Sequence, residues 1–294
     1  MRVLITGGDG YIGSNLVYLL QDRHQIVLYG HGSHYTELRE MGRKFYGIIG
    51  NMDNHAWLTK SMEGVDAVVH LAATTDATVA YQNVGNTAMV LSAARISNVK
   101  KFIFASSYVV YGPMSDRNIT ENTSPHPVSM YAFSKLACED DIVRSGLDFT
   151  IMRISHVYGE GHGVRQQGGL ISTFIKSAVQ NGVIEMTSPS EVRDYVNVID
   201  VGLAFMKALE VGAPKEIINV ASGVSITVGD MADIIAKTVH REKGIPVRLV
   251  SSSSTLKNYP VPVVNIDKAR EKLGYSPVYD LEANIVNQVK GETE

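Results

Sequence analysis

A tyrosine and a lysine lie four residues apart in the segment YAFSK, at Tyr131 and Lys135. On a helix this spacing puts both side chains on one face, with their Cβ atoms roughly 6 Å apart. A free tyrosine has a pKa of about 10, so it exchanges protons near neutral pH only if that pKa falls by about three units. An adjacent ammonium group favours the phenolate. We therefore expect Lys135 to acidify Tyr131, although the same spacing is also typical of solvated helix faces.

Two serines end a predicted strand in FASSYVVYG, shortly before this pair. Strand ends in an open parallel sheet point toward the ligand crevice. Ser107 is therefore expected to reach a substrate oxygen that Tyr131 also reaches. A hydroxyl there can hydrogen-bond the oxygen that becomes a carbonyl, while the tyrosine moves its proton. Ser106 is expected to be structural.

The segment TGGDGYIG follows the first predicted strand and opens the first predicted helix. Its glycines Gly7, Gly10 and Gly13 are three residues apart, a spacing related to the dinucleotide fingerprint GxGxxG but not identical to it. Glycines allow a tight turn and a close approach of a pyrophosphate, and the helix N-terminus supplies free N–H groups. The segment therefore predicts a phosphate-binding turn rather than a purely structural one.

The end of the second predicted strand should contact the adenosine ribose. A carboxylate there binds the 2′-hydroxyl of NAD and repels the 2′-phosphate of NADP. This chain has Gly30 followed by His31 instead, which slightly favours NADP, although no arginine follows to bind the phosphate. After the third strand, Asn51 and Met52 are expected near the adenine, and Asp53 fits either that role or a loop cap.

The first half of the chain alternates strand and helix patterns, which indicates βαβ units in a doubly wound parallel sheet with helices on both faces. Strands are expected over 2–6, 25–29, 66–73, 100–106 and 148–155, and helices over 12–22, 80–98 and 129–145. We expect a dinucleotide-binding domain over residues 1–153 plus part of 190–220. A smaller α/β substrate domain, interleaved with it, is expected over the remainder of 154–294.

The second half reads less regularly. Loops are expected over 158–169 and 251–264, helices over 170–182, 198–210 and 228–239, a short strand over 183–186, and a last helical stretch near the end.

Composition excludes several classes of protein. Hydrophobic residues make up 45% and charged residues 19% of 294 residues, as in ordinary globular proteins. A net charge of −3 gives no electrostatic case for nucleic acid or an anionic membrane. The single cysteine, Cys138, suits a reducing compartment and is expected to pack as a small apolar residue. The start MRVLITGG reads as a strand from its second residue, so we expect no signal peptide and a cytoplasmic protein. The sequence predicts no metal site.

Together TGGxGxxG, the serine in SSxxVYG and YxxxK resemble the extended short-chain dehydrogenase/reductase family, especially its nucleotide-sugar epimerases and reductases. The similarity extends over nearly the whole chain, through HLAA, MRISHVYGEG, RDYVNVIDV, INVASG and KLGYSP. It implies catalytic roles for Ser107, Tyr131 and Lys135, with Lys135 also holding the nicotinamide ribose. The further cofactor contacts that it implies are Tyr11, Ile12, Leu71, Ala72 and Ala73, and the substrate contacts are Thr74, Ser107, His156 and Arg193. Arg193 would bind the diphosphate of a sugar nucleotide.

The chain departs from the family pattern at positions that bear on the substrate. Dehydratases of this family carry an acidic residue just after the catalytic serine, whereas this chain has Tyr108, Val109 and Val110, which disfavours 4,6-dehydration. His156 replaces the usual asparagine and is equally consistent with a packing histidine. The late arginine-containing turn is replaced by NYPVPVVNIDKA, and Asn86 takes the place of a glycine in the NVxGT block.

The leading hypothesis is an NAD(P)-dependent nucleotide-sugar epimerase, similar to UDP-glucose 4-epimerase, that acts through a transient 4-keto intermediate. The alternative is an NADPH-dependent 4-keto-sugar reductase. A non-catalytic cofactor-sensing protein and an oxidoreductase of steroid-like substrates are less favoured. We also expect a homodimer, because helices 80–98 and 129–145 carry apolar residues on more than one face.

Overall fold

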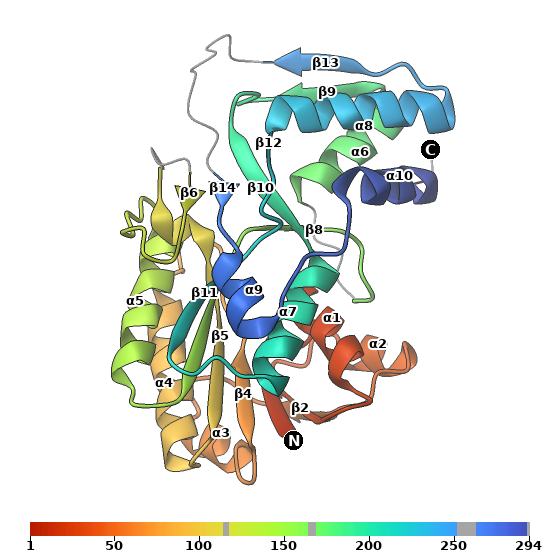
Figure 1. Ribbon diagram of the computed structural model, residues 1–294. Helices are drawn as coiled ribbons and strands as arrows, with labels where there is room; N and C mark the ends of the chain where they lie inside the picture. Colours follow the sequence, from red (N-terminus) through yellow and green to blue (C-terminus); the bar gives the residue numbers. More distant parts are fainter. Residues whose placement is uncertain (114–117, 164–168, 252–262, 293–294) are drawn as a thin grey trace.

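The computed structural model describes residues 1–113, 118–163, 169–251 and 263–292. Its main feature is a sheet of seven parallel strands in the order β11-β7-β5-β4-β1-β2-β3 (Figure 1). These strands are β1 (Arg2–Thr6), β2 (Gln25–Gly30), β3 (Tyr46–Ile49), β4 (Ala67–His70), β5 (Lys101–Ser107), β7 (Phe149–Ile154) and β11 (Glu216–Val220). The predicted doubly wound sheet is confirmed.

The central strands are apolar on both faces because helices cover both sides of the sheet. In β1, Val3 and Ile5 pack into one core, and Leu4 between them packs into the other. The first core is closed by α1 (Tyr11–Leu20), α2 (Tyr35–Glu40), α7 (Val198–Glu210) and α9 (Asp267–Leu273). The second is closed by α3 (His55–Ser61), α4 (Gln82–Ile96) and α5 (Met130–Arg144).

The strand order reverses beside β1, which pairs with β2 on one side and β4 on the other. In doubly wound sheets such a switch point leaves a crevice outside the carboxyl ends of the strands, where ligands bind. The glycine-rich turn follows β1 and the segment from Leu71 follows β4, so both open into this crevice.

Helix α5 begins where Ser129 accepts a hydrogen bond from the amide of Ala132, a standard N-cap. Its buried residues include Lys135, Cys138, Glu139 and Ile142, whose spacing of three and four residues places them on one side of the helix. Cys138 is buried in the second core, as expected. A side that faces the sheet and yet carries a lysine and a glutamate requires polar partners there.

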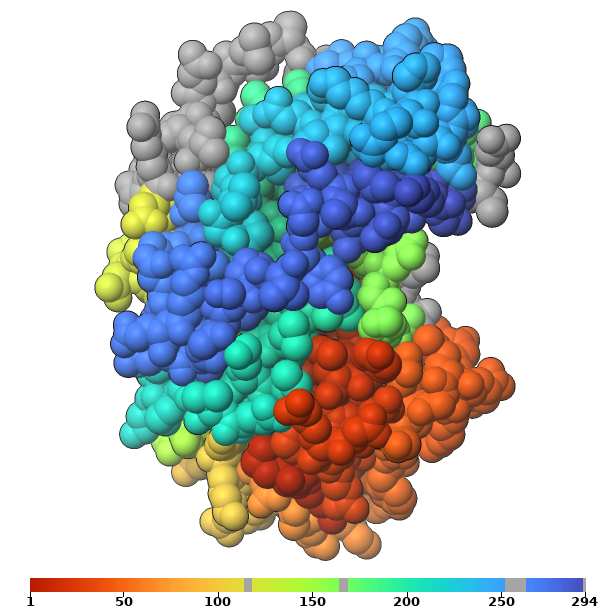
Figure 2. Space-filling view, turned by 45° about the vertical axis from the view of Figure 1, so that its right-hand side comes forward, coloured from red at the N-terminus to blue at the C-terminus, as the bar shows by residue number. Residues whose placement is uncertain are grey.

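A second group of elements lies above the large sheet in Figure 1 and has its own hydrophobic core. It contains the helices α6 (Leu170–Asn181), α8 (Val228–Lys243) and α10 (Leu281–Gly291). Its short sheets contain β8 (His156–Tyr158), β9 (Val183–Met186), β10 (Val192–Asn197), β12 (Ser225–Thr227) and β13 (Arg248–Ser251). Figure 2 shows a hollow on the right-hand side between the red N-terminal elements below and the blue C-terminal elements above.

Several predicted boundaries differ from those in the structure. The strand expected over 66–73 ends at His70, because the chain then leaves the sheet and enters the crevice. Helices α2 and α3 were not predicted. In the expected loop 251–264, residues 252–262 lie outside the described part, while Val263–Val264 form β14 against β6 (Asn118–Ile119). Residues 164–168 of the expected loop 158–169 also lie outside it.

In the described parts of the chain, no helix combines the length and the apolar character needed to cross a membrane.

Candidate active site

A cleft of about 780 Å³ lies at the carboxyl ends of β1, β4, β5 and β7. Among the residues that line it are Gly7, Gly10, Tyr11, Ile12, Gly13, Leu71, Ala73, Ser107, Tyr131, Lys135, His156 and Arg193. Segments far apart in the sequence therefore meet in one cavity. The structure brings together the predicted glycine turn, the serine–tyrosine–lysine set and two further predicted substrate contacts, His156 and Arg193.

In the glycine turn, the backbone packs closely against itself and against the segment after β4. Gly7 has a φ of +68°, and a Cβ there would lie 2.8 Å from the amide nitrogen of Ala72. A Cβ at Gly13 would lie 2.2 Å from the carbonyl oxygen of Gly7, so neither position tolerates a side chain. Helix α1 starts directly after Gly10, which has no side chain that could cover its first amides. The turn can thus accept an anion at a helix N-terminus.

The predicted residues at the adenosine end lie beyond the cleft lining. Gly30 ends β2, and its carbonyl oxygen accepts a hydrogen bond from Gly50. His31 is exposed, and the Asn51 side chain accepts from the amide of Met52, whose own side chain is buried. These residues lie at the carboxyl ends of β2 and β3, on the side of the sheet next to the glycine turn.

Tyr11 lines the cleft, but its hydroxyl donates to the carbonyl oxygen of Gly159. Burial raises the pKa of this phenol. In the structure Tyr11 therefore joins α1 to the segment after β8.

Ser107 and Tyr131 both line the cleft, from the end of β5 and the first turn of α5. Burial and the nearby Cys138 thiol raise the pKa of Tyr131 to about 12, while hydrogen bonding with Ser107 acts in the opposite direction. The Ser107 hydroxyl also accepts from the amide of Val109 at 3.4 Å, which fixes the start of the turn after β5.

Lys135 is only 2% exposed, and its Nζ donates to the carbonyl oxygen of Ala105 at 2.7 Å. The ammonium lies 4.6 Å from the centroid of the Phe104 ring and 5.8 Å from that of Tyr131. Burial lowers the pKa of Lys135 to about 8. The ammonium thus lies near the Tyr131 ring while bonded to the β5 backbone, and burial is the largest influence on the pKa of the phenol. The acidification of Tyr131 by Lys135 stays a prediction.

Ser106 also lines the cleft, but its hydroxyl is taken up by a buried side chain. Its hydroxyl donates to the Glu139 carboxylate, which in turn pairs with Arg153 at 2.6 Å. The expectation of a structural role for Ser106 agrees with these contacts.

At the other end of the cleft, His156 and Arg193 lie among aromatic side chains. The Tyr108 hydroxyl and His156 Nε2 are 3.1 Å apart, and the Tyr195 ring centroid lies 5.7 Å from that of His156. Burial, and then the charge of Arg193, lower the pKa of His156 to about 4, so the imidazole is neutral at physiological pH. Arg193 Nε contacts Glu191 Oε1 at 2.8 Å.

Two predicted contacts, Ala72 and Thr74, do not line the cleft. The amide of Ala72 donates to Thr6 Oγ1, and that of Thr74 donates to the Asn83 side chain, so Thr75 lines the cleft instead. Sequence reasoning also missed Tyr108, Val109, Ser155, Leu170 and Tyr195 as lining residues. Two signals were available: Tyr108 follows Ser107 directly, and Tyr195 shares a strand face with Arg193 in β10.

Comparisons with known proteins agree with this geometry. The model of the NAD-dependent epimerase/dehydratase family matches residues 3–221. A putative UDP-glucose 4-epimerase of Methanocaldococcus jannaschii is 27% identical over 298 residues, covering 96% of this chain and 95% of that protein. A human dTDP-D-glucose 4,6-dehydratase is 30% identical over 254 residues, covering 79% and 72% of the two chains. The structure of a Brucella ovis UDP-glucose 4-epimerase in complex with NAD is 25% identical, with a TM-score of 0.85 and coverage of 99% and 97%.

Proposed function

This chain belongs to the NAD-dependent epimerase/dehydratase family, and from this we propose that it is an NAD(P)-dependent nucleotide-sugar epimerase acting through a transient 4-keto intermediate. The observation that carries the proposal is that one cleft holds the glycine turn, Ser107, Tyr131, Lys135 and Arg193. Phosphate binding, proton transfer and anion recognition are thus available within reach of one ligand. We also infer that residues 1–153, with part of 190–220, bind the dinucleotide, and that the remainder binds the sugar nucleotide.

A nicotinamide dinucleotide fits the residues present. Its pyrophosphate suits the turn at Gly7, Gly10 and Gly13, where added Cβ atoms at Gly7 and Gly13 would clash with backbone. Lys135 would hold the nicotinamide ribose, since an ammonium has three donors and Ala105 uses only one. When bound, the nicotinamide would supply reversible hydride acceptance.

The residues of the chain then have separate tasks. Tyr131 takes the proton of the reacting sugar hydroxyl and later returns one. Ser107 donates to the same oxygen as it becomes a carbonyl. Arg193, on β10, binds the diphosphate through its planar guanidinium, so that the sugar is free to turn and present its other face.

The alternative is an NADPH-dependent reductase of 4-keto sugar nucleotides. It is favoured by Gly30, which puts no carboxylate at the ribose end of β2. Dehydration is disfavoured, although a dehydratase is among the relatives, because Tyr108, Val109 and Val110 follow Ser107 without an acidic side chain.

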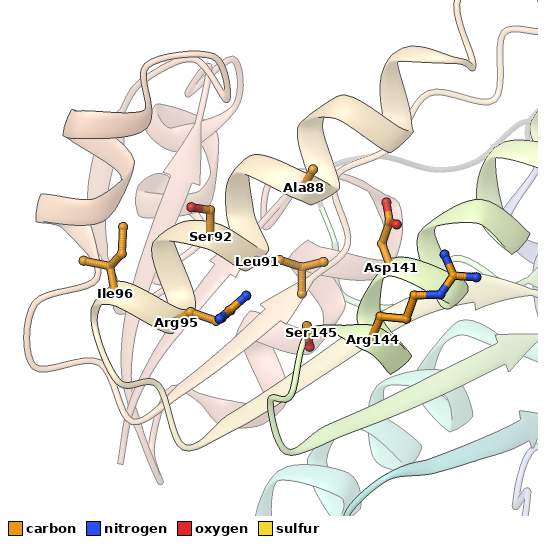
Figure 3. Close-up of a pocket in the computed structure, with 8 residues that line it drawn as sticks. All are labelled: Ala88, Leu91, Ser92, Arg95, Ile96, Asp141, Arg144 and Ser145. Carbon is orange, nitrogen blue, oxygen red and sulfur yellow. The ribbon is translucent and has the colours of Figure 1, made fainter.

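We further propose that the protein forms a homodimer through α4 and α5. The exposed large apolar side chains of these two helices are Met89 (39%), Ile96 (60%), Met130 (49%), Phe133 (54%) and Val143 (50%). Figure 3 shows the hollow between the helices, lined by Ala88, Leu91, Ser92, Arg95, Ile96, Asp141, Arg144 and Ser145. A second copy of the same surface would cover apolar residues that water otherwise contacts.

The test is to purify the protein, identify any retained nicotinamide nucleotide, and incubate it with UDP-glucose and, separately, with a 4-keto sugar nucleotide and NADPH. Conversion to the 4-epimer without net cofactor consumption supports epimerisation, and stoichiometric NADPH oxidation supports the reductase. Tyr131→Phe should lower turnover by about 10²- to 10⁴-fold. Tyr46→Phe, at a 65% exposed tyrosine, is the matched control. Full activity of Tyr131→Phe on every sugar would contradict both functions and favour a cofactor-sensing protein.

A further inference from the structure

An ion pair is buried directly behind the cleft. Glu139 and Arg153 have side chains only 3% and 4% exposed. Arg153 Nε lies 3.1 Å from Glu139 Oε1, and Arg153 Nη2 lies 2.6 Å from Oε2, so the pair is bidentate. Ser106 adds a third hydrogen bond to Oε1. Burying two charges costs free energy that their attraction often only just offsets, so stability alone is a weak reason for such a pair.

Two of the three side chains come from elements that carry the proposed chemistry, α5 and β5, and the third comes from β7, which pairs with β5. Glu139 follows Lys135 by one helical turn and Tyr131 by two, on the buried side of α5. Ser106 precedes Ser107 at the end of β5, and Arg153 stands opposite Ser106 in the parallel ladder of β5 and β7. The contacts therefore join α5 to the strand end from which Ser107 projects.

Arg153 is also held from its other side. Its guanidinium lies 4.8 Å from the centroid of the Tyr111 ring, whose hydroxyl donates to Asn219 Oδ1 at 2.7 Å. Asn219 belongs to β11, which pairs with β7. The guanidinium thus packs between the Glu139 carboxylate of α5 and the Tyr111 ring in the turn after β5. Its directional bonds to Glu139 can fix the position and rotation of α5.

We propose that the Ser106–Glu139–Arg153 network is a positioning device that holds α5 in register with β5, so that Tyr131 and Lys135 meet the oxygen bound by Ser107. The expected effect of this network on kcat rests on the proposed function, whereas its effect on the position of α5 does not. Lys135 also joins α5 to β5, by donating to the Ala105 carbonyl oxygen, but that ammonium must also serve the cofactor. Because the Ser106–Glu139–Arg153 network would hold α5 against β5 without contacting a ligand, Lys135 would remain free to bind the cofactor.

The sharpest variant is Glu139→Met/Arg153→Met, which replaces the pair with apolar side chains and leaves no unpaired charge. Such replacements are often neutral or stabilising, so the variant separates positioning from stability. We expect unchanged or higher thermal stability, KM and cofactor Kd within about threefold, and kcat lower by up to about 10²-fold, as for a misplacement of about 1 Å. Ser106→Ala, a milder change, should give a smaller fall in kcat in the same direction.

Two further measurements make the outcome decisive. Hydrogen exchange of α5 amides near residues 131–135 should accelerate in the double variant while that of α1 does not, and this readout needs no substrate. The matched control is Asp200→Asn in α7, a buried carboxylate that accepts from Val278 and Tyr279 amides away from the cleft. It should lose stability and keep kcat. Wild-type kcat together with unchanged α5 exchange in the double variant would overturn the inference. Absence of sugar turnover by the wild-type protein would instead count against the proposed function.

Discussion

Lys135 and Tyr131 are one helical turn apart on α5, but the Lys135 ammonium donates its hydrogen bond to the backbone of β5 rather than to the Tyr131 hydroxyl. Its Nζ is 5.8 Å from the Tyr131 ring centroid and donates to the Ala105 carbonyl oxygen at 2.7 Å. Burial raises the pKa of Tyr131 to about 12. A positively charged ligand beside the phenol would lower this pKa and make the phenolate accessible nearer neutral pH.

The first prediction is that oxidised cofactor lowers the pKa of Tyr131. A positive nicotinamide ring near the phenol favours the phenolate, so the titration should move down from about 12, and sugar oxidation should accelerate as pH rises through the new value. The measurement is ¹³Cζ-tyrosine NMR over pH with and without oxidised cofactor, with Tyr131→Phe to assign the signal. Reduced cofactor, whose ring is neutral, is the control. Identical titrations with both forms would contradict the prediction.

The second prediction concerns cofactor choice at the end of β2. A Cβ at Gly30 would meet only the Tyr35 hydroxyl, at an ordinary contact distance of 3.9 Å, so the position accepts a side chain. Gly30→Asp should weaken NADP binding by at least about tenfold, because like charges repel, while NAD binding holds or improves. Gly30→Asn, of the same size but neutral, is the control. Fluorescence titration with both cofactors measures the ratio, and equal losses for NAD and NADP would count against this placement of the ribose.

The third prediction concerns the anion end of the cleft. Glu191 contacts Arg193 at 2.8 Å, with side chains 44% and 23% exposed, and a diphosphate must compete for the same guanidinium. Glu191→Gln should tighten UDP binding by about three- to fivefold, since an exposed ion pair contributes no more than about 1 kcal/mol.

Calorimetry with UDP and with uridine separates phosphate recognition from base recognition. Only the UDP affinity should change, and Glu185→Gln, at an exposed carboxylate in β9, should change neither. Weaker UDP binding by Glu191→Gln would mean that Glu191 orients Arg193 rather than competing for it.

The fourth prediction concerns self-association. Ile96→Asp places a charge at a 60% exposed isoleucine beside the hollow between α4 and α5, and should convert a dimer to a monomer in light scattering. Ile49→Asp, at a 70% exposed isoleucine at the other edge of the sheet in β3, should leave the mass unchanged. A monomeric mass for the wild-type protein would contradict the proposed homodimer.

The parts of the site that could be predicted are those set by local periodicity. Parallel strands alternate with helices, so their carboxyl ends must meet, and the places of Gly7 and Ser107 beside the crevice follow from that rule. Tyr131 was predicted from its spacing to Lys135 and from the family resemblance. The pair Glu139–Arg153 could not be found in this way, because it joins α5 to β7 through side-chain contacts that depend on packing.

Other features of the cleft could not be predicted because they lie where no periodicity exists. Thr74 and Thr75 lie in the irregular segment after β4, where the Asn83 side chain bonds to the Thr74 backbone and Thr75 lines the cleft. Tyr108 and His156 are 48 residues apart and come into contact because β5 and β7 are neighbouring strands. Nothing at either position in the sequence predicts this contact. The hydrogen-bond acceptor of the Lys135 ammonium could not be predicted either, since residue spacing fixes the helix face on which a side chain lies but not the group to which it donates.

The last prediction is a loss of stability in acid that depends on His70. This histidine is fully buried at the end of β4, with Nδ1 2.6 Å from Thr6 Oγ1 and Nε2 3.0 Å from Thr87 Oγ1. Burial, and then the charge of Lys135, lower its pKa to about 3. Between that value and its ordinary 6.5 the unfolded chain binds the proton and the native protein does not.

The stability contribution of this histidine is therefore complete above pH 6.5 and is lost as pH falls, approaching about 1.4 kcal/mol per pH unit. Urea unfolding of the wild type and of His70→Gln between pH 7.5 and 4.5 measures the difference in slope. His70→Gln should be less stable than the wild type at pH 7.5, and its free energy of unfolding should fall less steeply as the pH is lowered. His126→Gln, at an exposed histidine, should follow the wild type. Parallel curves for wild type and His70→Gln would mean that the imidazole is protonated in the native protein, with Thr6 and Thr87 both accepting from it.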